Sequence, residues 1–184
     1  AGAHVTVPYQ EAVIPHLDIL SEGAKIIGAI NTVVWDGKVL KGYNTNAIGF
    51  MDTLEELGCE VAGKRALVFG SGGAAKAVVF IFNWLRAESV TITGRNAAKC
   101  REMAERLGGA WRPLESVLER PFRADIVVNA TSISSEDESA DFAAQVARLQ
   151  LEGCEVLIDL NYGRRENFWA AKAQSNGTRF VDGL

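Results

Sequence analysis

From residue 64 onward, the sequence alternates short apolar runs with helix-length segments, and this alternation limits the possible fold more than any other feature. The apolar runs are rich in Val, Ile, Leu and Phe and show little polar alternation, which is typical of strands covered by helices on both faces. Repeated units of strand, helix and strand predict a parallel, doubly wound α/β sheet. The expected strands are residues 65–69, 89–93, 125–130, 155–160 and 179–181, and the expected helices are residues 74–85, 97–107, 140–149 and 167–175.

The first 60 residues follow a different pattern, in which proline interrupts each early segment. Pro8 ends a short β-prone run, and Pro15 shortens or kinks a stretch with helical spacing. Asp36-Gly37 is a common hairpin turn signal between two strand-like runs. The expected elements are a strand at residues 5–7, a short helix within residues 10–20, strands at residues 30–35 and 38–43, and a helix at residues 46–57.

The charge distribution separates the same two parts of the chain. Residues 1–60 carry 3 basic and 8 acidic side chains, whereas residues 61–184 carry 16 and 15. Such a shift agrees with the change in secondary-structure pattern. We therefore expect a smaller, incomplete α/β domain at residues 1–60 and a doubly wound domain at residues 61–184.

Overall composition excludes several classes of protein. The net charge of −4 argues against a nucleic-acid binder or a protein of anionic membrane surfaces. No run of about 18 apolar residues is present to span a bilayer. The three cysteines lack CxxC or His/Cys ligand spacing, so no metal site is expected and a reduced, cytoplasmic protein fits best. The chain begins at Ala1 without a signal-peptide pattern, and we expect it to be part of a longer protein.

A glycine-rich segment, Gly70-Ser71-Gly72-Gly73-Ala74-Ala75, follows the first strand of the alternating region and opens the next helix. It fits the G-x-G-x-x-G/A pattern of a Rossmann-like domain. Gly70 allows the tight turn, Gly72 lets the backbone approach a pyrophosphate, and Ala75 permits close packing of helix on strand. The free N–H groups and the positive end of the helix dipole then face the anion. The segment predicts a dinucleotide site.

The residues after the second strand indicate which dinucleotide binds. NAD sites usually carry Asp or Glu about 20 residues beyond the glycines, to hold the ribose 2′-hydroxyl. Here Gly94, Arg95 and Asn96 stand at that position, with Lys99 one helical turn later. Two cations in place of an acid favour the 2′-phosphate of NADP(H). The alternative is that Arg95 and Lys99 are solvated surface charges.

Several segments together resemble the shikimate dehydrogenase family. The resemblance covers essentially the whole chain in family order. It implies a two-domain oxidoreductase that uses NADP(H) to reduce 3-dehydroshikimate to shikimate, in aromatic amino-acid and chorismate biosynthesis. The matching segments are Val5-Thr6-Val7-Pro8 with Glu11-Ala12-Val13, Ile27 to Thr32, Gly42-Tyr43-Asn44-Thr45, Gly70 to Ala75, Asn129-Ala130-Thr131-Ser132, Asp159 with Tyr162, and Val181-Asp182-Gly183-Leu184.

The resemblance also implies where ligands bind, with substrate on the N-terminal domain, cofactor on the C-terminal domain and hydride passing between them. Family members begin with a Ser-x-Ser segment and end with a returning helix, and neither is present in these residues. The implied substrate-binding residues are His4, Thr6, Asn31 and Tyr162. The implied cofactor-binding residues are Gly70, Ser71, Gly72, Gly73, Ala74, Arg95, Lys99, Asn129, Thr131, Ser132, Leu160 and Gly183.

Two substitutions fall on the catalytic positions of the family. Gln10 stands where the family has Lys, and Asn46 stands where it has Asp. Ketone reduction needs a proton for the developing alkoxide, and an amide cannot cycle one. Loss of general acid–base help costs about 10²–10⁴ in rate. His4 could supply the proton instead, or it could simply make structural hydrogen bonds.

Three hypotheses therefore remain open. The chain is a shikimate dehydrogenase-like enzyme, a catalytically impaired or regulatory paralogue that binds NADP(H), or an oxidoreductase for a different shikimate- or quinate-like substrate. Its partner is a small molecule, with no nucleic acid and no membrane, and its assembly is a monomer or homodimer. Among the other residues, His16 is expected at the surface, residues 134–141 as a solvated loop, and the four tryptophans, Trp35, Trp84, Trp111 and Trp169, as packing residues.

Overall fold

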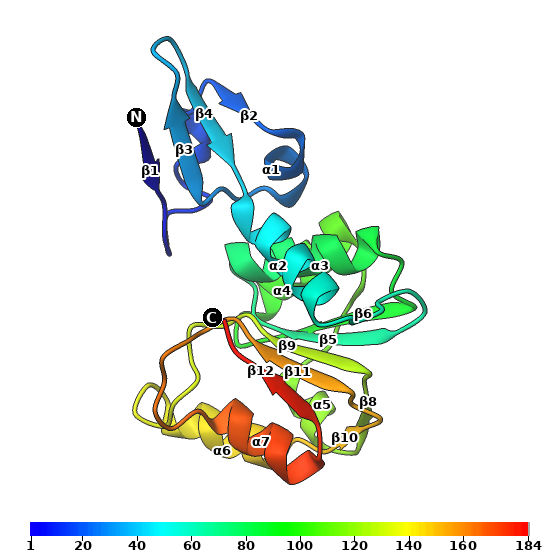
Figure 1. Ribbon diagram of the computed structural model, residues 1–184. Helices are drawn as coiled ribbons and strands as arrows, with labels where there is room; N and C mark the ends of the chain where they lie inside the picture. Colours follow the sequence, from blue (N-terminus) through cyan, green and yellow to red (C-terminus); the bar gives the residue numbers. More distant parts are fainter. Residues whose placement is uncertain (184) are drawn as a thin grey trace.

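The computed structural model describes residues 1–183 and contains two main β-sheets (Figure 1). The smaller one lies in the N-terminal part, and the larger one lies beyond helices α2 and α3. The small sheet has four strands in the order β1-β3-β4-β2, antiparallel except that β2 runs parallel to β4. Its strands are β1 (Gly2–His4), β2 (Ile19–Leu20), β3 (Thr32–Trp35) and β4 (Leu40–Tyr43).

The large sheet has six parallel strands in the order β12-β11-β9-β5-β6-β7. Numbered along the chain, this is the 3-2-1-4-5-6 order of dinucleotide-binding folds, in which ligands bind where the strand order reverses, between β5 and β9. The predicted α/β, doubly wound class is confirmed. The strands are β5 (Arg65–Phe69), β6 (Ser89–Thr93), β7 (Ala110–Trp111), β9 (Ile126–Asn129), β11 (Val156–Asp159) and β12 (Arg179–Val181).

Helices cover both faces of the large sheet, so its strands alternate between two apolar clusters. Val68 packs in the cluster with helices α2, α3 and α4, whereas its neighbours Leu67 and Phe69 pack with helices α5, α6 and α7. Each large buried side chain stabilises the fold by about 1.5–3 kcal/mol. The helices are α2 (Thr45–Glu56), α3 (Gly73–Trp84), α4 (Ala97–Leu107), α5 (Leu114–Leu118), α6 (Ala140–Arg148) and α7 (Phe168–Asn176).

Most helix starts follow local capping chemistry, but α3 and α5 have no side-chain cap. Asn44, Asn96, Ser139 and Asn167 each accept a hydrogen bond from a backbone N–H in the first turn of the following helix. The N-cap residue of α3 is Gly72, which has no side chain to cap the helix. The first N–H groups of α3 are therefore available to a ligand.

The N-terminal part departs most from the sequence predictions. Residues 5–7 are not a strand, since β1 ends at His4, and residues 10–20 are not an α-helix. Pro8 and Pro15 leave only turns and the 3-10 helix η1 (Ile14–His16) before β2. Helix α1 (Glu22–Ile27), capped by Ser21, was not expected, because its six residues are too few for a clear periodicity.

Other short elements were also missed, and two tryptophans were misjudged. Strand β7, helix α5 and the two-stranded sheet of β8 (Phe122–Arg123) and β10 (Leu151–Glu152) carry too few residues to show a period. Trp169 is fully buried, but Trp35 and Trp84 are exposed, so the packing role predicted for those two is wrong. His16 is exposed, as predicted.

The acidic stretch at residues 134–141 is more ordered than a solvated loop. Ser134 is fully buried, and the Glu138 carboxylate accepts hydrogen bonds from the N–H groups of Ser134 and Ser135. Burial raises the pKa of Glu138, but those N–H groups and Arg164 outweigh it, and the pKa is lowered. The prediction of a solvated loop is therefore wrong at Ser134, while the helix that it leads into begins at Ala140.

Candidate functional site

Gly70 forms the turn at the point where the strand order reverses. It has φ +123°, a conformation that L side chains rarely adopt, and its N–H donates to the Thr93 carbonyl at 2.8 Å. A Cβ on Gly70 would lie 2.8 Å from the Ala130 carbonyl oxygen. Only glycine fits here, so β5 turns into α3 directly beside the end of β9.

The residues after Gly70 present the start of α3 to a pocket. Gly72 is exposed and Gly73 is buried, and no side chain within residues 1–183 caps these N–H groups. The helix dipole adds partial positive charge at the same place. An uncapped helix start beside a glycine turn is a ready-made anion site.

A pocket of about 610 Å³ opens at this edge, where the carboxyl ends of β5, β6 and β9 meet. Six of the predicted cofactor residues line it, namely Gly70, Ser71, Gly72, Arg95, Thr131 and Ser132. Sequence reasoning missed the remaining lining residues, Val7, Gly94, Asn96, Ala97, Ala130 and Phe142. Motif position gives no signal for Val7 and Phe142, because they reach the pocket from the small sheet's flank and from α6.

The two cations predicted for NADP(H) do not lie equally close to this pocket. Arg95 lines it, directly beyond the end of β6. Lys99 is exposed and is absent from its wall; its N–H donates to the Asn96 side chain at 3.0 Å as part of the α4 cap. Arg95 is therefore the cation placed to meet a ligand phosphate.

Asn129 supports the pocket from beneath. It is fully buried, and its Oδ1 accepts from the Thr131 N–H at 3.1 Å and from the Thr131 hydroxyl at 2.7 Å. Gly73 and Ala74, two further residues of the glycine-rich segment, also lie outside the pocket lining. These three predicted cofactor residues shape the wall instead of forming its surface.

Below Gly94, the buried Cys100 thiol packs against the same turn. Burial raises the pKa of this thiol, with a smaller opposing effect from Ser71. The thiol is therefore neutral at physiological pH and adds no charge to the pocket.

On the small-sheet side, the predicted substrate residue Asn31 is hydrogen-bonded to Thr45 and to the substituted catalytic position Asn46. Its Nδ2 donates to Asn46 Oδ1 at 2.7 Å and to the Thr45 hydroxyl at 2.9 Å. Its Oδ1 accepts from the Thr45 N–H at 2.8 Å. His4, on β1, pairs with Thr32 on β3 and is exposed, as is Thr6. The structure thus gathers Asn31 and Asn46 at the start of α2.

Gln10 lies between the two parts of the molecule. Its Nε2 donates to the Val5 carbonyl at 3.2 Å, and its amide oxygen lies against Gly73, where a Cβ would collide with it. Within residues 1–183 no hydrogen bond joins Gln10 to Asn46. The two substituted catalytic positions therefore do not form a pair with each other.

Tyr162, Leu160 and Gly183 lie at the ends of β11 and β12, next to the pocket but outside its lining. The Leu160 N–H donates to the Asn129 carbonyl at 3.0 Å, and the Gly183 N–H donates to the Asn161 carbonyl at 3.0 Å. Tyr162 is exposed. Leu184, which completes the last matching segment, lies outside the described residues.

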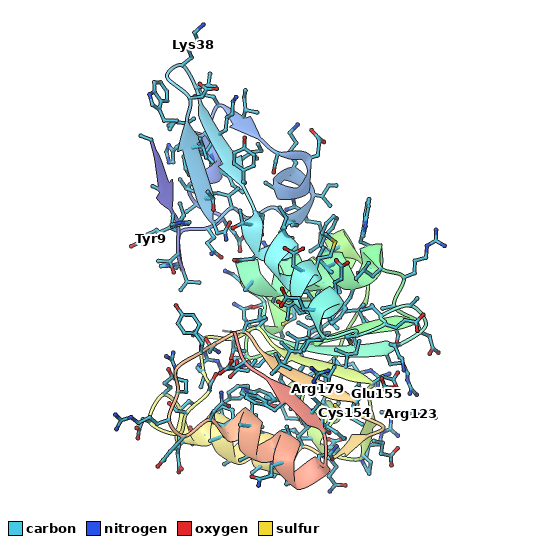
Figure 2. All side chains as sticks on the ribbon, viewed as in Figure 1. Tyr9, Lys38, Arg123, Cys154, Glu155 and Arg179 are labelled. Atoms are coloured by element: carbon cyan, nitrogen blue, oxygen red, sulfur yellow. The ribbon has the colours of Figure 1, made fainter. Side chains whose placement is uncertain are left out.

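Side-chain contacts join the two parts beside this site. Lys76 on α3 is buried, and its Nζ lies 2.8 Å from the carboxylate of Glu11, the residue after Gln10. Arg106 on α4 donates to the Lys25 carbonyl of α1 at 2.9 Å. Figure 2 shows Tyr9 projecting outward from the same segment, in agreement with its 64% exposure.

None of the helices within residues 1–183 is long and apolar enough to cross a membrane. No group of three or more His, Cys, Asp or Glu side chains is arranged to hold a metal ion there.

Two family descriptions match the chain. "Shikimate dehydrogenase substrate binding domain" matches residues 1–33, and "Shikimate / quinate 5-dehydrogenase" matches residues 53–164. Among curated relatives, a shikimate dehydrogenase (NADP(+)) of Caldanaerobacter subterraneus subsp. tengcongensis is 35% identical, over 100% of this chain and 66% of the relative. Another, from Nitrosopumilus maritimus, is 37% identical, over 100% and 67%.

Solved structures agree with these matches. Shikimate dehydrogenase 1 from Peptoclostridium difficile superposes with a TM-score of 0.83 at 29% identity, covering 100% of this chain and 66% of the other. Shikimate 5-dehydrogenase from Thermus thermophilus, in complex with NADP(H) and shikimate, gives 0.81 at 34% identity, covering 99% and 66%. The chain spans about two thirds of the length of the relatives it matches.

Proposed function

The chain belongs to the shikimate dehydrogenase family, and on that premise we propose that it is part of an NADP(H)-dependent oxidoreductase that reduces 3-dehydroshikimate to shikimate. The observation that carries this proposal is the pocket at the ends of β5, β6 and β9. It combines an uncapped helix start, a turn that only glycine fits, and one guanidinium group. These features fit an extended, doubly phosphorylated ligand that carries a third phosphate.

Each wall of the pocket has a separate role in holding the cofactor. The N–H groups at the start of α3 bind the diphosphate, and Arg95 binds the 2′-phosphate. Thr131 and Ser132 also line the pocket and would contact the nicotinamide half of the cofactor. When bound, the cofactor supplies or accepts the hydride. Val7 lines the same pocket from the small-sheet side, so both parts of the chain contribute to its lining.

Substrate orientation falls to the amide groups near the start of α2. Asn31, Thr45 and Asn46 present hydrogen-bond donors and acceptors that suit a hydroxylated ring. Since neither Gln10 nor Asn46 can release a proton, the alkoxide must take its proton from His4 or from solvent. We propose residues 1–60 as the substrate-binding part and residues 61–184 as the cofactor-binding part.

Titration of the full chain with NADPH and NADH, followed by fluorescence, tests the cofactor assignment. NADPH is expected to bind more tightly, and Arg95→Ala is expected to weaken NADPH about tenfold while leaving NADH unchanged. Lys99→Ala is the matched control, because Lys99 is exposed and lies outside the pocket wall, and it should change neither affinity. Equal affinities of the parent chain for the two nucleotides would contradict the assignment.

A second candidate is a paralogue that binds NADP(H) with impaired turnover. The observation that favours it is the placement of Gln10, which is bonded to Val5 and carries no titratable group toward Asn46. A third possibility, turnover of a quinate-like substrate, shares the same cofactor site.

Reduction of NADP⁺ by the full-length protein with shikimate or quinate separates these three functions. Turnover with shikimate supports the shikimate dehydrogenase-like enzyme, and turnover with quinate alone supports the oxidoreductase with a different substrate. Binding of NADP(H) without turnover supports the impaired paralogue.

Two further assignments stay predictions. The compartment is expected to be the cytoplasm, and the assembly a monomer or a homodimer.

A further inference from the structure

A fully buried carboxylate, Asp159, lies at the carboxyl end of β11. In the sheet register it stands directly beside Asn129 at the end of β9. A buried carboxylate is costly unless several donors satisfy its oxygens. The source of those donors therefore indicates what the residue does.

The donors to Asp159 come from three asparagines, of which Asn129 immediately precedes the pocket-lining residues 130–132. Its Oδ1 accepts from Asn129 Nδ2 at 2.8 Å, from the Asn161 N–H at 3.1 Å and from Asn161 Nδ2 at 3.0 Å. Its Oδ2 accepts from Asn167 Nδ2 at 2.7 Å. One carboxylate thus joins the end of β9, the segment after β11 and the start of α7.

The partners of Asp159 in turn hold the pocket wall. Asn129 accepts two hydrogen bonds from Thr131, and Asn161 Nδ2 donates to the Thr131 carbonyl at 2.8 Å. Asn161 Nδ2 also donates to the Ser134 hydroxyl at 2.8 Å. Thr131 lines the pocket, so only one amide side chain separates Asp159 from the pocket lining.

The same network secures the segment that carries Tyr162. Asn161 ties its beginning to Asp159, and Asn167 ties its end. Asn167 also accepts from the N–H groups of Trp169 and Ala170, which start α7. The segment 161–167 is therefore held at both ends by one side chain.

We propose that Asp159 is a positioning residue that sets the Thr131 wall and the Tyr162 segment in their binding arrangement, without touching a ligand itself. The proposal rests on the proposed function only in taking NADP(H) as the occupant of the pocket. A carboxylate is needed because it accepts on both oxygens. An amide would place a donor against a donor from Asn129, Asn161 or Asn167.

The test compares Asp159→Asn with Asp125→Asn, a matched control. Asp125 is also buried and lies just before β9, at the opposite end of that strand, where it accepts from the Arg65 N–H at 2.7 Å and from Arg65 Nε at 2.9 Å. Both variants are expected to lower the melting temperature. Only Asp159→Asn is expected to raise the Kd for NADPH, by about tenfold or more. Equal Kd values for both variants and the parent chain would overturn the proposal.

Amide hydrogen exchange of the ligand-free chain gives a readout that does not depend on the proposed function. Asp159→Asn should speed exchange in residues 130–135 and 160–167, while Asp125→Asn should leave both segments as protected as in the parent chain. If the parent chain fails to bind NADPH, the proposed function fails, and exchange alone still decides the role of Asp159.

Asn161→Ala serves as a milder second variant in case Asp159→Asn does not fold. Asn161 is only partly buried, and its loss removes the bonds to Thr131 and Ser134 while leaving the carboxylate in place. It should loosen residues 130–135 in the same exchange experiment. Unchanged protection of these residues in Asn161→Ala would contradict the network.

Discussion

The two sheets of this molecule differ in how completely they are covered. The large sheet has helices on both faces, and every residue of β9 and β11 is buried. In the small sheet every residue of β1 is exposed, and large apolar side chains such as Val34, Trp35 and Tyr43 face solvent. Figure 2 shows Lys38 at the tip of the β3–β4 hairpin, far from the large sheet.

This difference extends to the site itself. On the large-sheet side, the backbone of the glycine turn and of the helix start forms much of the pocket, so the shape of this part depends little on individual side chains. On the small-sheet side, the proposed substrate site consists of individual side chains held by amide hydrogen bonds, and Gln10 and Asn46 stand where the resemblance to the family implies Lys and Asp. The proposed function therefore predicts that cofactor binding persists while proton transfer changes.

The largest expected effect concerns the substituted positions. Gln10→Lys combined with Asn46→Asp should raise the rate of shikimate oxidation by about 10²–10⁴, because the two substitutions reintroduce the Lys and Asp that the family resemblance implies at these positions, and with them a proton donor. Steady-state assays with NADP⁺ measure it. Gln10→Lys alone is the control and should gain less, since the new charge lacks its partner. Equal rates in the double variant and the parent chain would show that these positions do not limit catalysis.

Next comes the glycine turn. Gly70→Ala should weaken NADPH binding by about 100-fold, because its φ of +123° and the clash with Ala130 force the turn to move. Gly37→Ala is the matched control: Gly37 has φ +95° in the exposed hairpin, with nothing within 4 Å of an added Cβ. It should lower the melting temperature and leave NADPH affinity intact. A loss of NADPH affinity in Gly37→Ala would break the contrast between the two sheets.

A smaller effect is expected where the two parts touch. Glu11→Gln leaves the buried Lys76 without its carboxylate and should lower the free energy of unfolding by about 2 kcal/mol. Lys76→Met should cost less, because Glu11 is half-exposed and can be hydrated. Urea denaturation measures both. If Lys76→Met lowers the free energy of unfolding more than Glu11→Gln does, the buried Lys76 does not need the Glu11 carboxylate to be stable in the fold.

The smallest expected effect is a difference between the two sheets in how strongly pH changes the stability of the fold. The Arg65 guanidinium lowers the pKa of Asp125 from 3.8 to about 2, and Lys41 lowers the pKa of Asp36 to about 2. Each carboxylate therefore stabilises the fold above pH 4, and this stabilisation is lost as the pH falls from about 4 toward 2. Between pH 4 and pH 2, the melting temperature should depend less on pH in Asp125→Asn than in Asp36→Asn. The reason is that water and salt screen the exposed pair of Asp36 and Lys41, so this pair contributes less to stability. The same pH dependence of the melting temperature in both variants would contradict this prediction.

Prediction from sequence succeeded where periodicity was long. Strands β5, β6 and β12 and helix α4 have the predicted bounds, and the other long helices differ by one or two residues. It failed in the first 30 residues, where turns, a 3-10 helix and the six-residue α1 replace the expected strand and helix. Helices as short as these do not repeat a 3.6-residue hydrophobic pattern often enough to be recognised, whereas short strands such as β5 and β6 are marked by continuous runs of β-prone residues.

Prediction of the site likewise succeeded for residues in local motifs and failed for residues placed by packing. The motif identified six residues that line the pocket, but it could not show that Lys99 lies outside the wall or that Val7 and Phe142 join it. Nor could it show that Gln10 contacts Gly73, or that Asp159 links the start of α7 to Asn129, which lies 30 residues before Asp159 in the chain. These facts depend on which elements pack together.

The sequence by itself determined the long helices and the strands β5, β6, β9, β11 and β12, the glycine turn at Gly70 and the residues at the positions matched to the family's catalytic pair, because these follow from local conformational preferences and chemistry. Only the tertiary structure decided which side chains face the pocket, which carboxylates are buried and where the two parts meet. The physical reason is that burial and long-range hydrogen bonds are set by packing between segments that the linear chain keeps apart.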